Sequence, residues 1–207
     1  MTAAMAALRA ADPVLAGLID AVGEEPPSPR PDRPPPGEHY AALVRTIAGQ
    51  QLSVRAARAI WNKLLVAFDG RPPTPQEVLD ADPEELRAAA GLSRAKVSYL
   101  RSLAEHVLTG ELELDRLEEL SDEEVIAELT AVRGLGEWSA HMFLMFQLER
   151  PDVLATGDLG VRRAVQLAYH LPALPTPAEL VGLAEAWRPH RTTACRVLWG
   201  SLENTPQ

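Results

Sequence analysis

The chain has 207 residues, 46% of them apolar and 24% charged, and no run approaches the ~20 apolar residues that a membrane span requires. A single cysteine, Cys195, excludes an internal disulfide and a four-cysteine zinc or iron–sulfur site, and Arg9 interrupts the Ala-rich start, which excludes a clean secretory signal. The formal net charge of −9 argues against nucleic-acid binding, because proteins that bind the phosphate backbone are usually basic. We therefore expect a cytoplasmic globular protein.

The pattern predicts helices along the whole chain. The first two lie near 13–23 and 39–50. Three more have a capping serine, Ser53, Ser93 or Ser121, followed by apolar residues at three- to four-residue spacing. These apolar positions are Val54, Ala57, Trp61, Leu64 and Phe68; Val97, Leu100, Leu103 and Val107; and Val125, Ile126 and Leu129. Four further helices are expected near 137–148, 159–170, 177–186 and 190–202. No alternating run indicates a strand, so the fold class is all-α.

Proline-rich segments separate the predicted helices. Pro26 to Pro36 predicts a stiff, polar strap, and the segments 72–75 and 172–177 separate later helices.

The charged residues are unevenly distributed along the chain. Acidic residues concentrate at 80–85 and 111–128. Basic residues gather elsewhere, at Arg55, Arg58 and Lys63; Arg94, Lys96 and Arg101; Arg162 and Arg163; and Arg188, Arg191 and Arg196. Because salt limits electrostatic fields to about 8–10 Å, a patchy surface of this kind can bind DNA locally.

The segment from Leu129 to Phe143 contains two glycines, Gly134 and Gly136, around one apolar residue and between two predicted helices. Glycine permits a sharp turn that presents bare N–H groups at a helix N-terminus, and such groups attract phosphate without a basic side chain. The alternative is a simple helix–loop–helix corner, and from these two glycines alone it is the favoured interpretation.

Four segments together resemble the helix–hairpin–helix DNA glycosylase superfamily, in the branch of the bacterial 3-methyladenine DNA glycosylase II enzymes. They are the hairpin segment and the segments Ile47 to Ser53, Gly91 to Lys96 and Asp152 to Val161, in family order between Asp12 and Leu202. The bacterial enzyme has an extra N-terminal β domain, for which this chain is too short.

The resemblance implies a two-lobed, all-α fold with the active-site cleft between the lobes. Residues 1–40, an N-terminal helix and the proline-rich strap, are expected to pack with the C-terminal lobe. Residues 41–148 are expected to form a helical-bundle lobe that ends in the helix–hairpin–helix. Residues 149–207 are expected to form a C-terminal helical lobe with the catalytic aspartate.

Asp158 is the predicted catalytic residue. It lies 20 residues after Trp138, which is the family's spacing for its essential aspartate. Its residue context also predicts a helix N-cap, and the two roles are compatible. Cleavage of a glycosidic bond builds positive charge on the sugar, which a fixed carboxylate stabilises.

The resemblance also implies the type of reaction. Lyase-type relatives use a lysine two residues after the second hairpin glycine, where this chain has Trp138. We therefore expect a hydrolase that releases alkylated bases, such as 3-methyladenine and 7-methylguanine, and leaves an abasic site. Trp138, Met142 and Trp199 match positions of the base pocket, with Met142 in place of a tyrosine; Trp61 and Trp187 are assigned to the core.

The partner implied by the resemblance is double-stranded DNA with a damaged base. Gln51 matches the residue that fills the gap left by the flipped nucleotide, and Gln50 is expected to support it. Gly134, Gly136 and Ser139 are expected to donate backbone N–H groups to phosphate. The main-chain carbonyls of Thr130, Val132 and Leu135 are expected to hold Na⁺ or K⁺. No other cofactor, no iron–sulfur cluster and no membrane partner are expected, and the enzyme is expected to act as a monomer.

Three alternatives to this function remain open from the sequence. The chain could be a helix–hairpin–helix module that binds DNA without cutting it. It could be a sibling glycosylase for mismatched or oxidised bases, although it lacks the iron–sulfur cysteines and the lysine of those relatives. It could also be an all-α protein-interaction domain, which would suit the acidic total charge.

Overall fold

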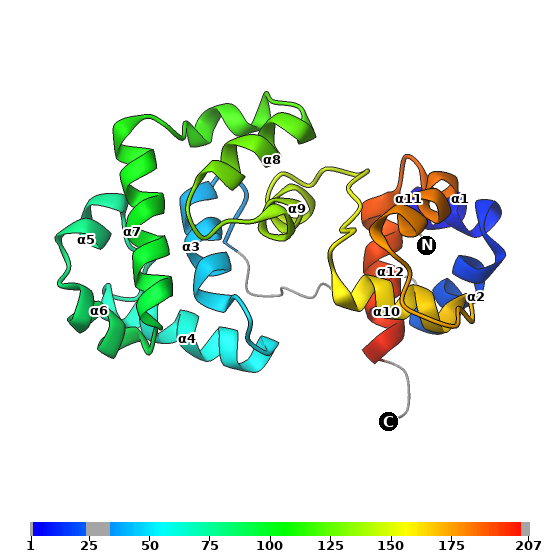
Figure 1. Cartoon of the computed structure of the whole chain (residues 1–207), viewed down its shortest axis with the longest axis horizontal. Helices are drawn as coiled ribbons and strands as arrows, with labels where there is room; N and C mark the ends of the chain where they lie inside the picture. Colours follow the sequence, from blue (N-terminus) through cyan, green and yellow to red (C-terminus); the bar gives the residue numbers. More distant parts are fainter. Residues whose placement is uncertain (1, 24–33, 204–207) are drawn as a thin grey trace. The chain divides into compact units, whose positions relative to one another are not determined.

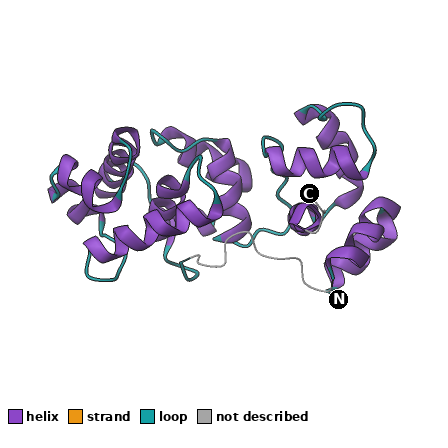
Figure 2. Cartoon of the chain, turned by 90° about the horizontal axis from the view of Figure 1, so that it is seen from below, coloured by secondary structure: helices purple, strands orange, loops and turns teal. Residues whose placement is uncertain are grey.

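The computed structural model describes residues 2–23 and 34–203, and within these ranges it consists of helices and loops without a strand (Figure 2). The all-α expectation is confirmed. The chain forms two compact units, which we call the terminal unit (residues 1–31 and 149–207) and the central unit (residues 32–148). Most of the expected strap, residues 26–33, lies outside the described residues. None of the helices described is long and apolar enough to cross a membrane.

The central unit is built around α3 (His39–Gly49), which packs against α4 (Val54–Ala67), α7 (Arg94–Thr109) and α9 (Glu137–Phe146) (Figure 1). Its remaining elements are α5 (Pro75–Asp80), α6 (Pro83–Ala90), the 3₁₀ helix η1 (Leu114–Glu118) and α8 (Asp122–Ala131). Seven residues of α3, 41–44 and 46–48, show its position best, because all their side chains are buried. This burial on most faces explains why α3 carries almost no charge.

The terminal unit joins the two ends of the chain around α12 (Arg191–Glu203), against which α1 (Ala3–Ala11), α2 (Pro13–Val22) and α10 (Leu159–Ala168) pack (Figure 1). It also contains α11 (Pro177–Ala184) and the 3₁₀ helix η2 (Glu185–Trp187). The side chains of Ala194, Cys195, Val197 and Leu198 bury one face of α12. Cys195 is a core residue, and its burial raises the pKa of the thiol to about 12, which disfavours the nucleophilic thiolate.

The three predicted serine caps are confirmed, because Ser53, Ser93 and Ser121 each accept a hydrogen bond from the backbone N–H three residues later. Trp61 and Trp187 are core residues, as expected. The apolar face predicted for α4 is wrong at its start, where the Val54 side chain is 63% exposed.

The prolines begin helices that the sequence pattern did not predict. Pro75 is the first residue of α5, which starts with a capping box between Thr74 and Glu77, and Pro83 is the first residue of α6, capped by Asp82. Both helices are shorter than the window over which hydrophobic periodicity is visible. The signal that could have found them is a capping residue before a proline, which is favoured at the first helical position.

Asp12 links the N-terminal helices to the C-terminal ones within the terminal unit. Its Oδ1 accepts hydrogen bonds from the N–H groups of Val14, at 2.8 Å, and Leu15, at 3.1 Å, and so caps α2. Its Oδ2 accepts from the Trp187 indole at 2.9 Å and from the Tyr169 hydroxyl. Burial by itself raises the pKa of Asp12, but the hydrogen bonds from Tyr169, Trp187 and the two backbone groups outweigh it and leave the pKa below its ordinary value.

Replacing Asp12 with Asn should therefore destabilise the protein. The change weakens the helix cap and leaves both Tyr169 and Trp187 without a charged acceptor, for a loss of about 2–4 kcal/mol in the free energy of unfolding. Urea denaturation measures this loss, with Asp20→Asn, in an exposed pair with Arg9, as the control that should change stability little.

The stability difference between wild type and Asp12→Asn should depend on pH. Because the folded pKa lies below the unfolded value, the contribution of Asp12 is complete above about pH 4–5 and is lost as the pH falls through the folded pKa. A difference that stays constant down to the acid unfolding transition would contradict this assignment.

Candidate active site

Asp158 lies directly before α10 and caps it, as the sequence predicts. Its Oδ1 accepts a hydrogen bond from the N–H of Val161 at 2.8 Å. The same oxygen accepts from the indole Nε1 of Trp199, on α12, at 2.9 Å. One donor is part of the backbone and the other is a rigid ring, so together they fix the orientation of the carboxylate.

Gly160 makes the contact between Asp158 and Trp199 sterically possible. A Cβ atom built at position 160 would lie 3.0 Å from Asp158 Oδ1 and 3.1 Å from Trp199 Cδ1, tighter than an ordinary van der Waals contact. The glycine therefore leaves room for the edge of the indole ring beside the first turn of α10.

The loop that leads to Asp158 is anchored on the start of α12. Asp152 accepts hydrogen bonds from Arg191 Nε, at 2.8 Å, and from Arg188, at 2.7 Å. Thr192 accepts from the Val153 N–H at 3.0 Å and donates to the Arg150 carbonyl at 2.6 Å. The helix that carries Trp199 thus also holds the segment that delivers Asp158, which keeps the two side chains in register.

The hairpin, residues 132–136, joins α8 and α9 in the central unit and packs against α7. Gly134 has a φ of +95°, in the region that favours glycine, and its backbone lies against the ring of Tyr99. A Cβ atom at this position would lie 2.1 Å from Tyr99 Cγ. The second glycine, Gly136, has a φ of −111° and open space where its Cβ would be.

The N-terminus of α9 is the part of the hairpin suited to an anion. Gly136 precedes the helix and supplies no side-chain cap. The first N–H groups of any α-helix lack intrahelical acceptors, and the helix dipole is positive at this end. Ser139 belongs to this first turn, with its side chain buried.

Gln50 and Gln51, the residues expected at the gap left by a flipped nucleotide, lie at the end of α3 beside the hairpin. The Gln50 side chain donates to the Gly134 carbonyl at 2.7 Å and contacts Ser139 Oγ at 3.4 Å. Gln51 follows with an exposed side chain and a φ of +57°, a left-handed conformation that is costly for a residue with a Cβ. The Lys96 ammonium donates to the Ala48 carbonyl at 2.9 Å and holds this end of α3 on α7.

The two predicted pocket residues of α9 differ in exposure. Trp138, in the first turn, is 37% exposed, whereas Met142 is 3% exposed. The third pocket residue, Trp199, lies in the terminal unit beside Asp158. The structure therefore brings Gln50, Gly134 and Ser139 together in one unit and Asp158 and Trp199 together in the other.

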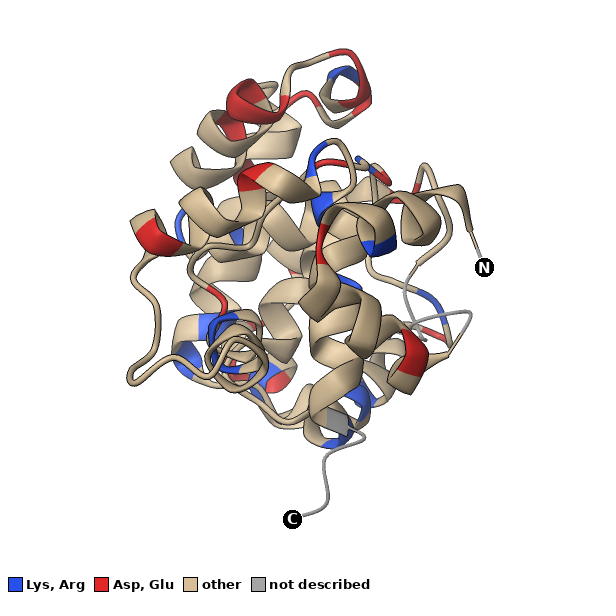
Figure 3. Ribbon diagram, turned by 90° about the vertical axis from the view of Figure 1, so that its right-hand side faces the viewer, with Lys and Arg blue, Asp and Glu red and all other residues tan. Residues whose placement is uncertain are grey.

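Several residues that position this site were missed in the sequence. Tyr99 and Lys96 are more than 30 residues from the groups they contact, and Arg191 lies 39 residues from Asp152. Pairs this far apart leave no local pattern. The concentration of acidic residues was visible in the sequence, and the structure places those of η1 and α8 close together, at the top of Figure 3.

Comparison with known proteins places the chain among DNA repair enzymes. Residues 44–189 match the model of the HhH-GPD superfamily base excision DNA repair proteins. The chain is 36% identical to DNA-3-methyladenine glycosylase 1 of Schizosaccharomyces pombe over 88% of this chain and 79% of that protein.

Two solved structures have the same fold. The S. pombe 3-methyladenine DNA glycosylase (Mag1) in complex with abasic DNA superimposes with a TM-score of 0.86 and 34% identity, over 100% of both chains. A DNA-3-methyladenine glycosidase from Bacillus halodurans superimposes with a TM-score of 0.79 and 34% identity, over 96% of this chain and 88% of that one.

The two hairpin glycines should differ in their effect on folding. Gly134→Ala forces a Cβ into the Tyr99 ring at an unfavourable φ, which should cost about 2–4 kcal/mol of folding free energy. Gly136→Ala meets no neighbour and should change stability by less than about 1 kcal/mol. Thermal or urea unfolding of the two variants measures the contrast, and equal losses would show that Gly134 is not packed against Tyr99.

Proposed function

The chain belongs to the HhH-GPD superfamily of base excision DNA repair proteins, and we propose that it hydrolyses the N-glycosidic bond of alkylated bases, of the 3-methyladenine and 7-methylguanine type, in duplex DNA. The observation that carries this proposal is the Asp158 carboxylate, fixed through Oδ1 by Val161 and Trp199 at the start of α10. The proposal is also supported by the similarity to the S. pombe 3-methyladenine DNA glycosylase, whose structure matches over the whole chain.

DNA binding in this proposal depends on backbone groups more than on charge. The N–H groups of Gly134, Gly136 and Ser139 at the N-terminus of α9 bind a phosphate oxygen, aided by the helix dipole. A chain with a net charge of −9 can use such a site because it needs no basic side chain. The absence of a Cβ at Gly136 lets the phosphate approach the backbone closely.

The damaged base must leave the duplex before its glycosidic bond can be reached. Gln51 is placed to fill the gap, because it is exposed and lies at a strained turn that Gln50 and Lys96 hold against the hairpin and α7. Trp138 offers an exposed aromatic ring to a cationic base. Met142 is nearly buried and offers little surface for stacking, so we assign it to the wall of the pocket.

Asp158 supplies the chemistry. As the bond from C1′ to the base nitrogen breaks, its electron pair leaves with the base and positive charge builds on the sugar. The carboxylate stabilises this charge, and water then attacks C1′ while one of its protons passes to Asp158 or to solvent. An alkylated purine that carries a positive charge leaves as a neutral base and needs no general acid.

We infer that the product is an intact abasic strand. The position of the lyase lysine is Trp138, and the chain has only two lysines, Lys63 and Lys96. The Lys96 ammonium is engaged with the Ala48 carbonyl. No amine is therefore assigned to attack C1′, and water is the nucleophile.

The hairpin also fits a monovalent cation, Na⁺ or K⁺. Thr130 and Val132 lie at the end of α8, where the last carbonyls of a helix lack intrahelical donors and the helix dipole is negative. The Val132 carbonyl accepts one hydrogen bond, from Leu135 at 3.0 Å, and keeps a second lone pair. With the Leu135 carbonyl these groups would hold the ion, which would add positive charge near the bound phosphate. Within the described ranges no group of three acidic, histidine or cysteine side chains could hold a metal.

One lesion engages one enzyme molecule in this scheme, so we propose that the protein acts as a monomer. Its place of action is the compartment that holds the DNA, which in a prokaryote is the nucleoid.

The central assay separates base release from strand cleavage. Wild type should release methylpurine from alkylated DNA without nicking the strand, and Asp158→Asn should lower the release rate at least about 100-fold while still binding DNA. Chromatography measures the free base, and denaturing gels measure nicking before alkali. Asp20→Asn, an exposed carboxylate of the same unit, is the control.

Two results would contradict the proposal in different ways. Release by Asp158→Asn at the wild-type rate would remove Asp158 from the reaction and leave a DNA-binding module or another active site. Strand nicking by the pure wild-type protein would overturn hydrolysis as the only step.

Trp199→Phe should slow the reaction by orienting Asp158 less well. Phenylalanine keeps a smaller aromatic ring at this position but loses the N–H donor to Asp158 Oδ1, which should lower the rate of base release roughly tenfold. The dissociation constant for abasic duplex should change by less than about twofold, because the phosphate site lies on other residues. An unchanged rate of release would show that the indole N–H has no positioning role.

A further inference from the structure

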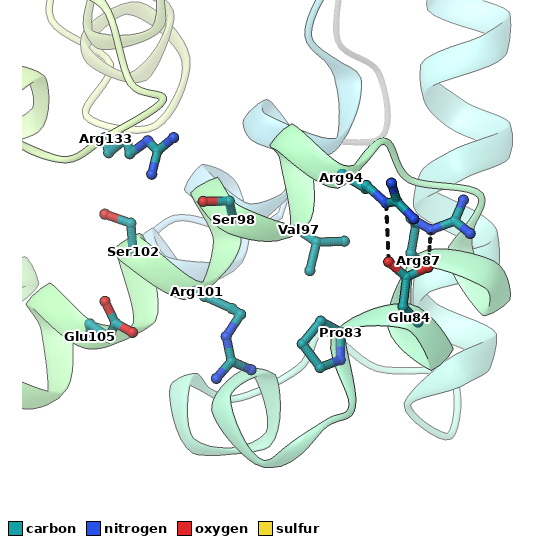
Figure 4. Close-up of a pocket in the computed structure, with 10 residues that line it drawn as sticks. All are labelled: Pro83, Glu84, Arg87, Arg94, Val97, Ser98, Arg101, Ser102, Glu105 and Arg133. Atoms are coloured by element: carbon teal, nitrogen blue, oxygen red, sulfur yellow. Dashed lines mark hydrogen bonds and ion pairs between the residues drawn. The ribbon is translucent and has the colours of Figure 1, made fainter.

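A hollow of about 520 Å³ lies in the central unit, outside the groups that the proposed reaction uses (Figure 4). Residues of α6 and α7 form its walls, and the hairpin contributes one residue, Arg133. Four arginines line it, namely Arg87, Arg94, Arg101 and Arg133, with only two glutamates. Its lining therefore carries a net charge of +2, in a chain whose net charge is −9.

Ion pairs and hydrogen bonds already fix two sides of the hollow. Glu84 accepts from Arg87 Nε at 2.7 Å and from Arg94 Nε at 3.2 Å, so one of the two glutamates is neutralised (Figure 4). Arg101 donates through one nitrogen to the carbonyls of Val78, Leu79 and Ala81 and closes the end of α5. Arg87, Arg94 and Arg101 therefore bond to protein groups and form two sides of the hollow.

Arg133, Ser98 and Ser102 form that remaining side. None of the three side chains has a protein partner among the residues that the structure describes. Ser98 and Ser102 are four residues apart, so they lie on one face of α7, and Arg133 reaches toward that face from the hairpin (Figure 4). A guanidinium beside two hydroxyls is a set of donors that suits a phosphate.

The hairpin holds Arg133 in this position. Arg133 directly precedes Gly134, and the backbone of Gly134 lies on the ring of Tyr99, which is the neighbour of Ser98 on α7. The hollow and the phosphate site at the start of α9 are therefore parts of one rigid arrangement, only a few residues apart along the backbone.

We propose that this hollow is a second phosphate site, in which Arg133, Ser98 and Ser102 bind a further backbone phosphate of the DNA strand that the hairpin holds. The proposal rests on the proposed function. Phosphates repeat every ~3.4 Å along the axis of each strand, so a strand bound at Gly136 presents further phosphates close by. This continuity with the hairpin favours DNA over an acidic segment of another protein.

The test is the salt dependence of binding to a duplex with a tetrahydrofuran abasic site, which cannot be hydrolysed. Arg133→Ala should weaken binding roughly tenfold at low salt and reduce the slope of log K against log salt by about 0.9, the value for one phosphate contact. Ser98→Ala with Ser102→Ala should weaken binding with little change in slope. Arg116→Ala, which removes an exposed arginine of η1 in the same unit, is the charge-matched control and should change neither quantity.

Shortened duplexes identify the phosphate. When nucleotides are removed stepwise from each end, the effect of Arg133→Ala should vanish at one length on one side of the lesion only. An effect that is equal for every duplex would show a general charge effect and overturn the site.

Three further results would also overturn the proposal. Wild-type affinity and slope in both the arginine and the serine variants, with unchanged melting temperature, would show that the hollow binds no phosphate. If wild type binds a polyglutamate peptide and Arg133→Ala does not, while both bind DNA equally, the hollow binds acidic protein segments and not DNA. Failure of the wild-type protein to bind any duplex would overturn the proposed function itself. Normal base release by wild type, together with an unchanged salt slope in Arg133→Ala, would overturn only this inference.

Discussion

The hydrogen bonds that converge on Asp158 Oδ1 are the constraint on which the proposed chemistry depends. A carboxylate can stabilise a developing positive charge only if it is already in place when the charge appears, since reorganisation at that moment would cost energy. The N–H of Val161 and the indole of Trp199 provide this fixed position. Two further residues of the terminal unit support this position: Gly160 leaves room for the indole, and Arg191 anchors the loop that leads to Asp158.

In the proposed function the central unit has a different task, which is to bind DNA although the chain is acidic. Gly134 lies against Tyr99, and Gln50 donates to the Gly134 carbonyl, so packing fixes the backbone of the hairpin. The proposed phosphate site at the N-terminus of α9 uses backbone N–H groups and therefore needs no basic side chain. Acidic residues gather on η1 and α8, at the top of Figure 3.

The sequence could predict those features whose causes are local. The serine caps, the cap at Asp158 and the glycine turn of the hairpin each depend on residues within four positions of one another. Family spacing added Trp138 and Trp199 as candidate pocket residues, but it could not show that Trp199 donates to Asp158, since 41 residues separate them. Asp12 shows the same difference. An aspartate before a proline indicates a helix cap in the sequence, whereas Tyr169 and Trp187 become its neighbours only through the fold.

The most direct measurement of the central claim compares two abasic duplexes that differ only in charge at the sugar, one with a neutral tetrahydrofuran and one with a cationic pyrrolidine. If Asp158 stabilises positive charge at C1′, wild type binds the cationic duplex at least about tenfold more tightly than the neutral one, a difference of about 1.4 kcal/mol, and Asp158→Asn loses that preference while it binds the neutral duplex as wild type does. An equal preference in the two proteins would contradict the account.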